Sequence, residues 1–405
     1  MDIENLEKRK IKSVSREIVL KIEKYANEGV SIGYENDKVI FVRYAIPDEI
    51  IRAKVYKETK DYAIAEPIEI INPSPLRIAP HCKYFGLCGG CDYQMISYEN
   101  QIKIKKDLVE ETFKRIAGIS IKINDIIKSP KQFYYRNNET FKVELKKKKS
   151  IGFFRKDTRS IIDIERCEIA MEGVNKALEH IRNSEERPAH NFKVRTTLDG
   201  DTVVHWVKSS LYEDRDVYEN ITVFDRTIKF KISKDSFFQV NDYVIPLWLE
   251  KIISFLDKEH NERIVDLYCG IGLITLFVSF YAKETIGVEI AKSSIQDANH
   301  NLKINKISSN VKFILSPVEE IVNKIGYADV IIIDPPRKGI DNKSIQEIIK
   351  ISPKKIIYSS CKPSSMARDI AIFSKYYDIK EVVLVDMFPQ THHIELLALL
   401  IKKEI

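Results

Sequence analysis

The spacing of apolar residues near the N-terminus predicts a small β-structure. Between about residues 14 and 70, short runs rich in β-branched and aromatic residues alternate with turn residues such as Asn36-Asp37. Runs of this kind are typical of strands. The predicted strands are Ile18–Ile22, Val39–Val42, Ile50–Val55 and Tyr62–Ala65. Because several short strands follow one another at this spacing, we expect a small β-barrel.

The middle of the chain has two further patterns. Residues 98–116 have a helical pattern, in which Ile102, Leu108, Val109, Phe113 and Ile116 are the apolar members. Residues from about 133 to 235 are mixed and mainly β in character. We therefore expect one amphipathic helix followed by an α+β segment.

The pattern changes again from about residue 245, where short buried-type strands alternate with helical segments. The predicted strands are Val265–Leu267, Thr285–Glu289, Val311–Leu315, Val330–Ile333 and Lys355–Tyr358. Alternation of this kind predicts a parallel, doubly wound sheet, and the right-handed crossover rule makes a Rossmann-like order the default. Leu396–Leu400 is expected to form the last strand.

The composition is that of an ordinary globular protein and does not indicate a particular function. The 405 residues carry a net charge of +6, but 59 acidic residues are interspersed, so charge alone indicates a solvated surface. No stretch reaches the ~18 to 20 apolar residues of a membrane span. The first residues, 1–12, lack the apolar core of a signal peptide. We therefore expect a cytoplasmic protein without a membrane partner.

A glycine turn after the first Rossmann-like strand predicts a nucleoside site. Gly270 and Gly272 let the backbone approach a ligand closely, and Glu289 ends the next strand nineteen residues after Gly270. A carboxylate at that place can accept hydrogen bonds from both ribose hydroxyls. Position 275 is Thr where a dinucleotide fingerprint needs a third glycine. A ligand without a pyrophosphate, such as S-adenosylmethionine, therefore fits better.

Three later segments place reactive groups at strand ends. Asp334-Pro335-Pro336-Arg337 follows the strand Val330–Ile333, and open α/β sheets bind ligands at this edge. Cys361 follows the next strand in a polar loop, where Lys362 and Arg368 are expected to lower its thiol pKa. Glu395 stands at the entrance to the last strand. His392 and His393 just before it are expected to serve packing or substrate contacts.

Three cysteines within ten residues predict a metal site. Cys82, Cys88 and Cys91 are spaced C-x5-C-x2-C, and Cys167 is the candidate fourth ligand. Tetrahedral zinc and a cubane iron–sulfur cluster both need four such ligands, and the spacing alone does not separate them.

Taken together, these motifs resemble the RNA uracil-C5 methyltransferase family. The resemblance covers residues from about 236 to the end and includes Ser236–Asn241, the glycine turn, Asp-Pro-Pro-Arg at 334, Ser-Cys-Lys-Pro at 360 and Asp-Met-Phe-Pro at 386. It implies that Cys361 adds to carbon 6 of a uracil and that Glu395 removes the carbon 5 proton. It also implies a pocket for S-adenosyl-L-methionine that contains Gln239, Tyr268, Glu289 and Asp334.

The resemblance has further implications for organisation and partners. It implies a structural 4Fe-4S cluster on the four cysteines, a TRAM-like barrel over residues 14–72, a central domain over 75–235 and a catalytic domain over 236–405. The partner is expected to be structured RNA, with 23S ribosomal RNA placed before transfer RNA, and no obligate protein partner is implied. A target base in folded RNA has to be flipped out. Lys362, Gln390 and Leu273 depart from residues that are common in the family.

Two alternative functions make different use of the same residues. An amino methyltransferase acting on adenine or guanine places an aromatic residue after its Pro-Pro turn, where this chain has Arg337. Such an activity also gives no function to Cys361 and Glu395. A non-catalytic iron–sulfur module that binds RNA or senses redox state needs neither of these two residues. The catalytic interpretation uses all the motifs.

Overall fold

The chain divides into two compact units in a computed structural model that describes residues 12–144, 150–184, 188–206, 209–256, 261–307 and 310–404. The first unit consists of residues 1–108, 144–168 and 388–393. The second consists of residues 109–143, 169–387 and 394–405. Each unit is assembled from segments that are distant in sequence, so the chain passes between the units several times.

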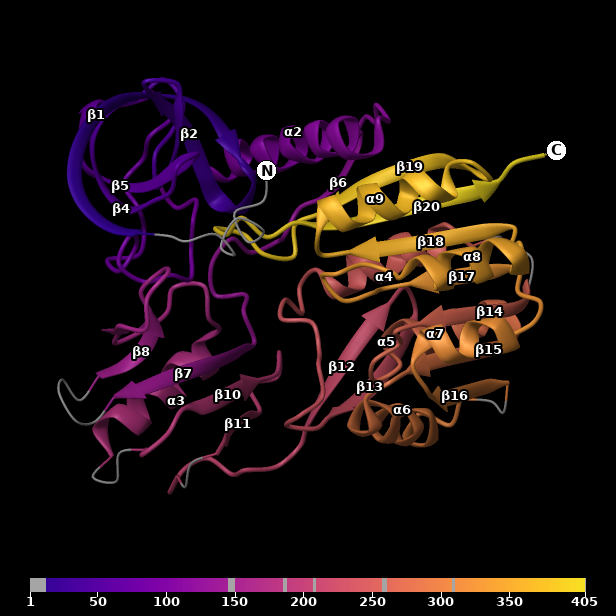
Figure 1. Cartoon of the computed structure of the whole chain (residues 1–405). Helices are drawn as coiled ribbons and strands as arrows, with labels where there is room; N and C mark the ends of the chain where they lie inside the picture. Colours follow the sequence, from indigo (N-terminus) through magenta and orange to yellow (C-terminus); the bar gives the residue numbers. More distant parts are fainter. Residues whose placement is uncertain are drawn as a thin grey trace. The chain divides into compact units, whose positions relative to one another are not determined.

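A closed barrel forms the N-terminal part of the first unit (Figure 1). Its strands run in the order β1-β2-β3-β5-β4. Their bounds are β1 Lys12–Ala26, β2 Val30–Glu35, β3 Lys38–Arg43, β4 Ile50–Glu58 and β5 Tyr62–Asn72, and the turn η1 is Asn27–Gly29. Ile18, Leu20 and Ile22 are buried at alternate positions of β1, which is the period that a half-buried strand requires. The four strands predicted in this region are confirmed.

The rest of the first unit is mostly irregular backbone around the cysteines. It contains residues 73–97, the first half of α2 (Tyr98–Ala117), and the paired strands β8 (Ser150–Phe154) and β9 (Ile161–Asp163). The predicted helix 98–116 is confirmed as α2. The short loop Phe388–His393 completes the unit, although its neighbours on both sides in the chain belong to the second unit.

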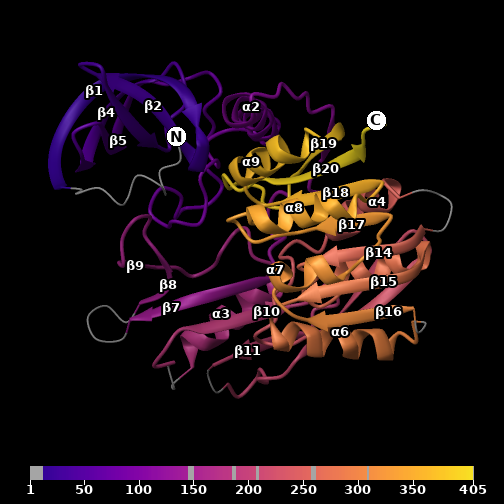
Figure 2. The ribbon, with the colours of Figure 1, turned by 45° about the vertical axis from the view of Figure 1, so that its right-hand side comes forward.

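An eight-stranded sheet is the centre of the second unit (Figure 2). Its order is β16-β15-β14-β17-β18-β20-β19-β6. The bounds are β6 Asp125–Ile127, β14 Asn261–Leu267, β15 Ala282–Glu289, β16 Val311–Leu315, β17 Val330–Ile333, β18 Lys355–Ser360, β19 Tyr377–Val385 and β20 Glu395–Lys402. The five neighbouring strands β16, β15, β14, β17 and β18 are parallel to one another, as predicted. Strand β20 lies between β18 and β19 and is antiparallel to both.

Helices and a smaller β-region surround this sheet. The helical segments are α3 Glu172–Asn183, α4 Ile245–Ser254, α5 Leu273–Val278, η2 Ser279–Tyr281, α6 Lys292–Ile304, α7 Val318–Ile321, η3 Val322–Lys324, α8 Asn342–Ile351 and α9 Pro363–Phe373. The remaining strands are β7 Asn138–Glu144, β10 Phe192–Thr196, β11 Thr202–His205, β12 Val217–Val223 and β13 Arg226–Ile232. α4 packs on α5 and β12, whereas α7, α8 and α9 pack one against the next.

The described helices include none with the length and hydropathy of a bilayer-crossing segment. The residues of the predicted central domain, 75–235, are shared between the two compact units. The predicted domain bounds stay predictions. The assignment of the barrel as a TRAM domain stays a prediction.

Candidate active site

Strand pairing brings Cys361 and Glu395 to the same end of the sheet. Cys361 directly follows β18, and Glu395 is the first residue of β20. These strands are antiparallel, and the last pair in their register joins Ser360 to Leu396. The hydroxyl of Ser359 donates a hydrogen bond of 3.0 Å to Oε1 of Glu395. The Cys361 thiol and the Glu395 carboxylate, both predicted from the sequence, therefore lie at adjacent ends of two neighbouring strands.

Glu395 and Asp334 are two carboxylates in one buried environment. Glu395 is 4% exposed, and burial raises its pKa well above the ordinary value, with a further increase from the charge of Asp334. The hydrogen bond from Ser359 opposes this increase. Burial also raises the pKa of Asp334, whose backbone amide donates to the carbonyl of Leu267 at 3.3 Å. Two nearby carboxylates in a low dielectric cannot both ionise easily, so a proton is retained at this pair closer to neutral pH.

The thiol of Cys361 does not have the lowered pKa that its sequence context predicts. Burial, together with smaller contributions from the charges of Glu395 and Asp334, raises the pKa of this half-buried thiol to about 12. The cation that opposes the increase is Arg337, not Lys362 or Arg368. Arg368 instead donates to the buried carboxylate of Asp369 at 2.8 Å. The predicted influence of Lys362 and Arg368 is wrong, and the resting thiol is protonated at neutral pH.

This arrangement predicts how Cys361 reacts with a thiol reagent. Alkylation by iodoacetamide requires the thiolate, so its rate on Cys361 is expected to rise through pH 8 to 10, about tenfold per pH unit. Glu395→Gln removes one of the charges that disfavour the thiolate, so it should make alkylation faster at every pH in this range. Glu262→Gln, an exposed carboxylate paired with Lys283, is the matched control and should leave the rate unchanged. Peptide mass spectrometry separates Cys361 from the other cysteines. An unaltered rate in Glu395→Gln would contradict the coupling.

The glycine turn and Glu289 form the predicted nucleoside loop. The amide of Gly270 donates to Oε2 of Glu289 at 3.1 Å, whereas Oε1 accepts from the amides of Ile290 and Ala291 at 2.8 Å each. Gly270 has φ +54° with open space beside it, so the backbone there is accessible to a ligand. These contacts fix the Glu289 carboxylate at the end of β15, beside the turn after β14.

Two other predicted pocket residues, Tyr268 and Gln239, lie outside helices and strands in the same unit. Tyr268 adopts a φ of +67° immediately after β14, and burial raises the pKa of its hydroxyl. The carbonyl of Gln239 accepts from Nδ2 of Asn137 at 3.1 Å, and the same nitrogen donates to Asp242 at 2.8 Å. Asn137 therefore holds the segment that carries Gln239, a role that the sequence does not reveal.

Comparison with known proteins places these motifs in a family. The model of the tRNA (uracil-5-)-methyltransferase family matches residues 206–329 and 318–403. An uncharacterised RNA methyltransferase of Aquifex aeolicus is 32% identical, over 95% of this chain and 98% of its own. The chain belongs to the RNA uracil-5-methyltransferase family. A second family relative, an uncharacterised RNA methyltransferase of Caldanaerobacter subterraneus, is 30% identical with the same coverage.

The fold of this family member also matches a solved structure over nearly its whole length. The crystal structure of Pyrococcus abyssi tRNA (uracil-54, C5)-methyltransferase in complex with S-adenosyl-L-homocysteine superposes with a TM-score of 0.74 at 23% identity. The match covers 94% of this chain and 100% of the other. The chain therefore has the same fold as that enzyme.

The four cysteines predicted to bind a cluster in this family member all lie in the first unit. Cys82, Cys88, Cys91 and Cys167 are all partly exposed. Burial raises the pKa of Cys91, and the charges of Cys88 and then Cys82 contribute to the increase. Within the described ranges, however, no three or more His, Cys, Asp or Glu side chains converge as a metal-binding group. The geometry thus does not show the predicted 4Fe-4S site.

Proposed function

We propose that this protein transfers a methyl group from S-adenosyl-L-methionine to carbon 5 of a uridine in structured RNA. The observation that carries the proposal is the pairing of β18 with β20, which places the Cys361 thiol and the buried Glu395 carboxylate at the same strand end. An amino methyltransferase or a non-catalytic RNA-binding module has no use for such a pair.

The chemistry assigns one task to each of these two groups. Carbon 5 of uracil is a weak nucleophile, and addition of the Cys361 thiolate to carbon 6 turns it into an enolate with electron density at carbon 5. Once carbon 5 carries the new methyl group, Glu395 removes the remaining carbon 5 proton. The electron pair of that C–H bond then restores the double bond and expels the thiolate. Because burial raises its pKa above the ordinary value, the carboxylate is a stronger proton acceptor than an exposed glutamate, which suits general base catalysis.

The residues of the nucleoside loop fit the methyl donor. S-adenosyl-L-methionine supplies an electrophilic methyl group on its sulfonium when bound. The Glu289 carboxylate can accept hydrogen bonds from the ribose hydroxyls of this ligand. The open space beside Gly270 lets the ligand approach the backbone closely. One carboxylate oxygen of Asp266, Oδ1, is buried and has no hydrogen-bond partner in the described parts of the chain. An acceptor of this kind fits a ligand that brings its own N–H donors. Tyr268, Gln239 and Asp334 would complete the pocket.

We further propose that the four cysteines bind a structural 4Fe-4S cluster. Burial raises the pKa of Cys82, whereas the backbone amides of Tyr84 and Glu168 act against this increase. Glu168 follows Cys167 directly, so this amide links the first cysteine to the neighbour of the fourth. Amides that face a sulfur stabilise thiolate ligands. We expect about four iron atoms per chain after anaerobic purification. The iron content of the Cys91→Ser variant should be markedly lower. Iron content that is unchanged in Cys91→Ser would contradict the assignment.

The proposed RNA is 23S ribosomal RNA, with transfer RNA as the second candidate. The cysteine set favours ribosomal RNA, whereas the family name and the Pyrococcus abyssi enzyme refer to tRNA. Mapping 5-methyluridine in both RNA classes from a deletion strain decides between them. Loss of one modified position in ribosomal RNA supports the proposal, and loss confined to transfer RNA replaces it with the second candidate. Unchanged 5-methyluridine in both classes would contradict the proposed activity.

A further inference from the structure

The loop Phe388–His393 lies just before the proposed base along the chain. The strand before it, β19, and the strand after it, β20, belong to the second unit, but the loop itself belongs to the first. Glu395 is the second residue after the loop and opens β20. Whatever fixes the loop therefore also fixes the chain from which the Glu395 side chain projects.

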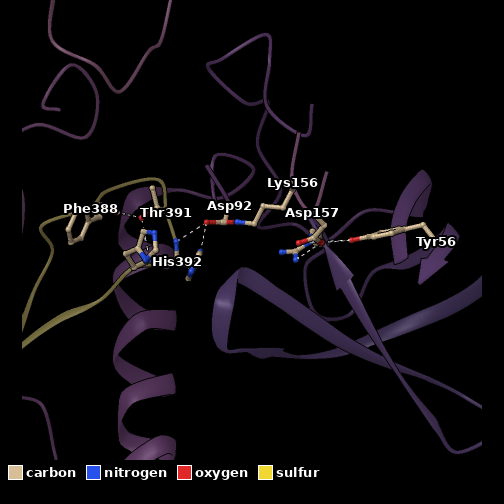
Figure 3. A network of polar contacts seen from close by, with 9 residues as sticks. Tyr56, Asp92, Lys156, Asp157, Phe388, Thr391 and His392 are labelled. Atoms are coloured by element: carbon tan, nitrogen blue, oxygen red, sulfur yellow. Dashed lines mark hydrogen bonds and ion pairs between the residues drawn. The ribbon is translucent and has the colours of Figure 1, made fainter. Parts of the chain in front are cut away.

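Asp92 holds this loop with one carboxylate oxygen and contacts Lys156 with the other (Figure 3). Oδ2 accepts from Nδ1 of His392 at 2.6 Å and from the His392 amide at 3.1 Å. Oδ1 accepts from Nζ of Lys156 at 2.9 Å. Asp92 is 2% exposed, so these charge-assisted contacts are shielded from water and are stronger than the same contacts at a surface.

Other buried contacts of the first unit hold the middle and the start of the loop. The amides of Asp92 and Tyr93 donate to the carbonyl of Gln390 at 2.9 and 3.1 Å. The side chain of Gln101 donates to Oε1 of Gln390 at 2.9 Å and accepts from its amide at 3.0 Å. Lys105 donates to the carbonyl of Phe388 at 3.1 Å. Gln390 has φ +69°, a conformation that is unfavourable for a non-glycine residue and persists only where its surroundings enforce it.

The charged network continues from Asp92 to the barrel. Lys156 is followed by Asp157, whose Oδ2 accepts from Nη2 of Arg43 at 2.8 Å and from the hydroxyl of Tyr56 at 3.1 Å. Arg43 ends β3 and Tyr56 lies in β4, so the turn between β8 and β9 is tied to the barrel wall. Asp92 is thereby held at a fixed place in the first unit while it holds His392 (Figure 3).

We propose that Asp92 is a positioning residue for the base Glu395, acting through its contacts to His392. The inference rests on the proposed function and adds a residue outside the motifs that identify the family. A loosened loop lets the start of β20 shift, so the carboxylate no longer meets the carbon 5 proton at the required distance. Displacements of about 1 Å cost roughly 100-fold in rate in such reactions. Because Cys361 lies on a different strand, addition of its thiolate to the uracil is unaffected.

The test separates the first covalent step from product release. Asp92→Asn is expected to form the covalent adduct with 5-fluorouridine RNA at the wild-type rate. On natural RNA it should release product about 10- to 100-fold more slowly and accumulate the methylated covalent intermediate. Asp48→Asn, an exposed carboxylate of the same unit paired with Lys21, is the matched control and should behave as wild type. An Asp92→Asn variant that releases product at the wild-type rate overturns the inference.

A pair of substitutions at His392 provides an independent readout. His392→Ala is expected to slow product release. Asparagine can place an N–H close to the position of Nδ1, so His392→Asn is expected to release product at close to the wild-type rate. Equal slowing of adduct formation and of release in both variants would indicate a general structural defect and overturn the positioning role. If the wild-type enzyme forms no adduct with 5-fluorouridine RNA, the proposed function itself fails, and this inference fails with it.

Discussion

Cys361→Ala is expected to lower methyl transfer to RNA by at least about 10⁴-fold, because the uracil is then left without covalent activation. The side chain is half-buried at the end of β18, and alanine keeps its Cβ atom, so the substitution should leave the protein folded. The measurement is incorporation of a radioactive methyl group from S-adenosyl-L-methionine into RNA. Binding of the donor should persist, because the nucleoside loop is unchanged.

Ser374→Ala is the matched control for this substitution. It removes a small polar atom from the last turn of α9, where the hydroxyl donates only within its own turn to Ala371. Normal turnover is expected in this variant. Substantial methyl transfer by Cys361→Ala would contradict covalent activation by this thiol.

Glu395→Gln is expected to stop the reaction after methyl transfer rather than before it. Glutamine retains the oxygen that accepts from Ser359 but cannot take a proton, so the thiolate cannot be expelled. Release of methylated RNA should fall by about 10²- to 10⁴-fold, the usual contribution of a general base. Protein covalently joined to methylated RNA should accumulate as a species that survives denaturing electrophoresis.

Glu381→Gln serves as the control on the neighbouring strand β19, where Glu381 pairs with Lys251 at 2.9 Å. This variant should turn over normally. Release of free product by Glu395→Gln at the wild-type rate would show that another group removes the proton.

Local sequence patterns predict most of the fold because they reflect burial directly. The strands of the parallel sheet, the helix α2 and four barrel strands follow from the spacing of apolar residues. Strand β2 is missed because Gly33 interrupts its pattern. The structure shows the reason for that glycine, since a Cβ atom there would lie 2.6 Å from the carbonyl of Lys21 on the paired strand.

The candidate site is predictable in its residues but not in its electrostatics. Motifs identify Cys361 and Glu395, yet the antiparallel register of β18 and β20 that joins them is a long-range pairing without a local signal. Burial of the thiol, followed by the charges of Glu395 and Asp334, reverses the pKa change expected from adjacent lysine and arginine in the sequence. Ser359 and Asn137 support the site through contacts that only the folded chain creates.

The loop before Glu395 shows why sequence motifs and structural units need not coincide. Residues 388–393 belong to a motif that continues into the catalytic strand, but their hydrogen bonds connect them to residues about 300 positions earlier, such as Asp92. From the sequence, His392 is predicted to serve packing or substrate contacts. The structure shows that it donates hydrogen bonds to Asp92, a partner that proximity in the sequence could not identify.

The central claim is covalent catalysis by Cys361, and a mechanism-based trap tests it most directly. RNA that contains 5-fluorouridine at the target position is incubated with the wild-type enzyme and S-adenosyl-L-methionine, and the protein is digested and examined by mass spectrometry. Fluorine cannot leave carbon 5 as a proton does, so the peptide that contains Cys361 is expected to carry the methylated, fluorinated nucleotide. The absence of an adduct, or an adduct on a different cysteine, would contradict the mechanism.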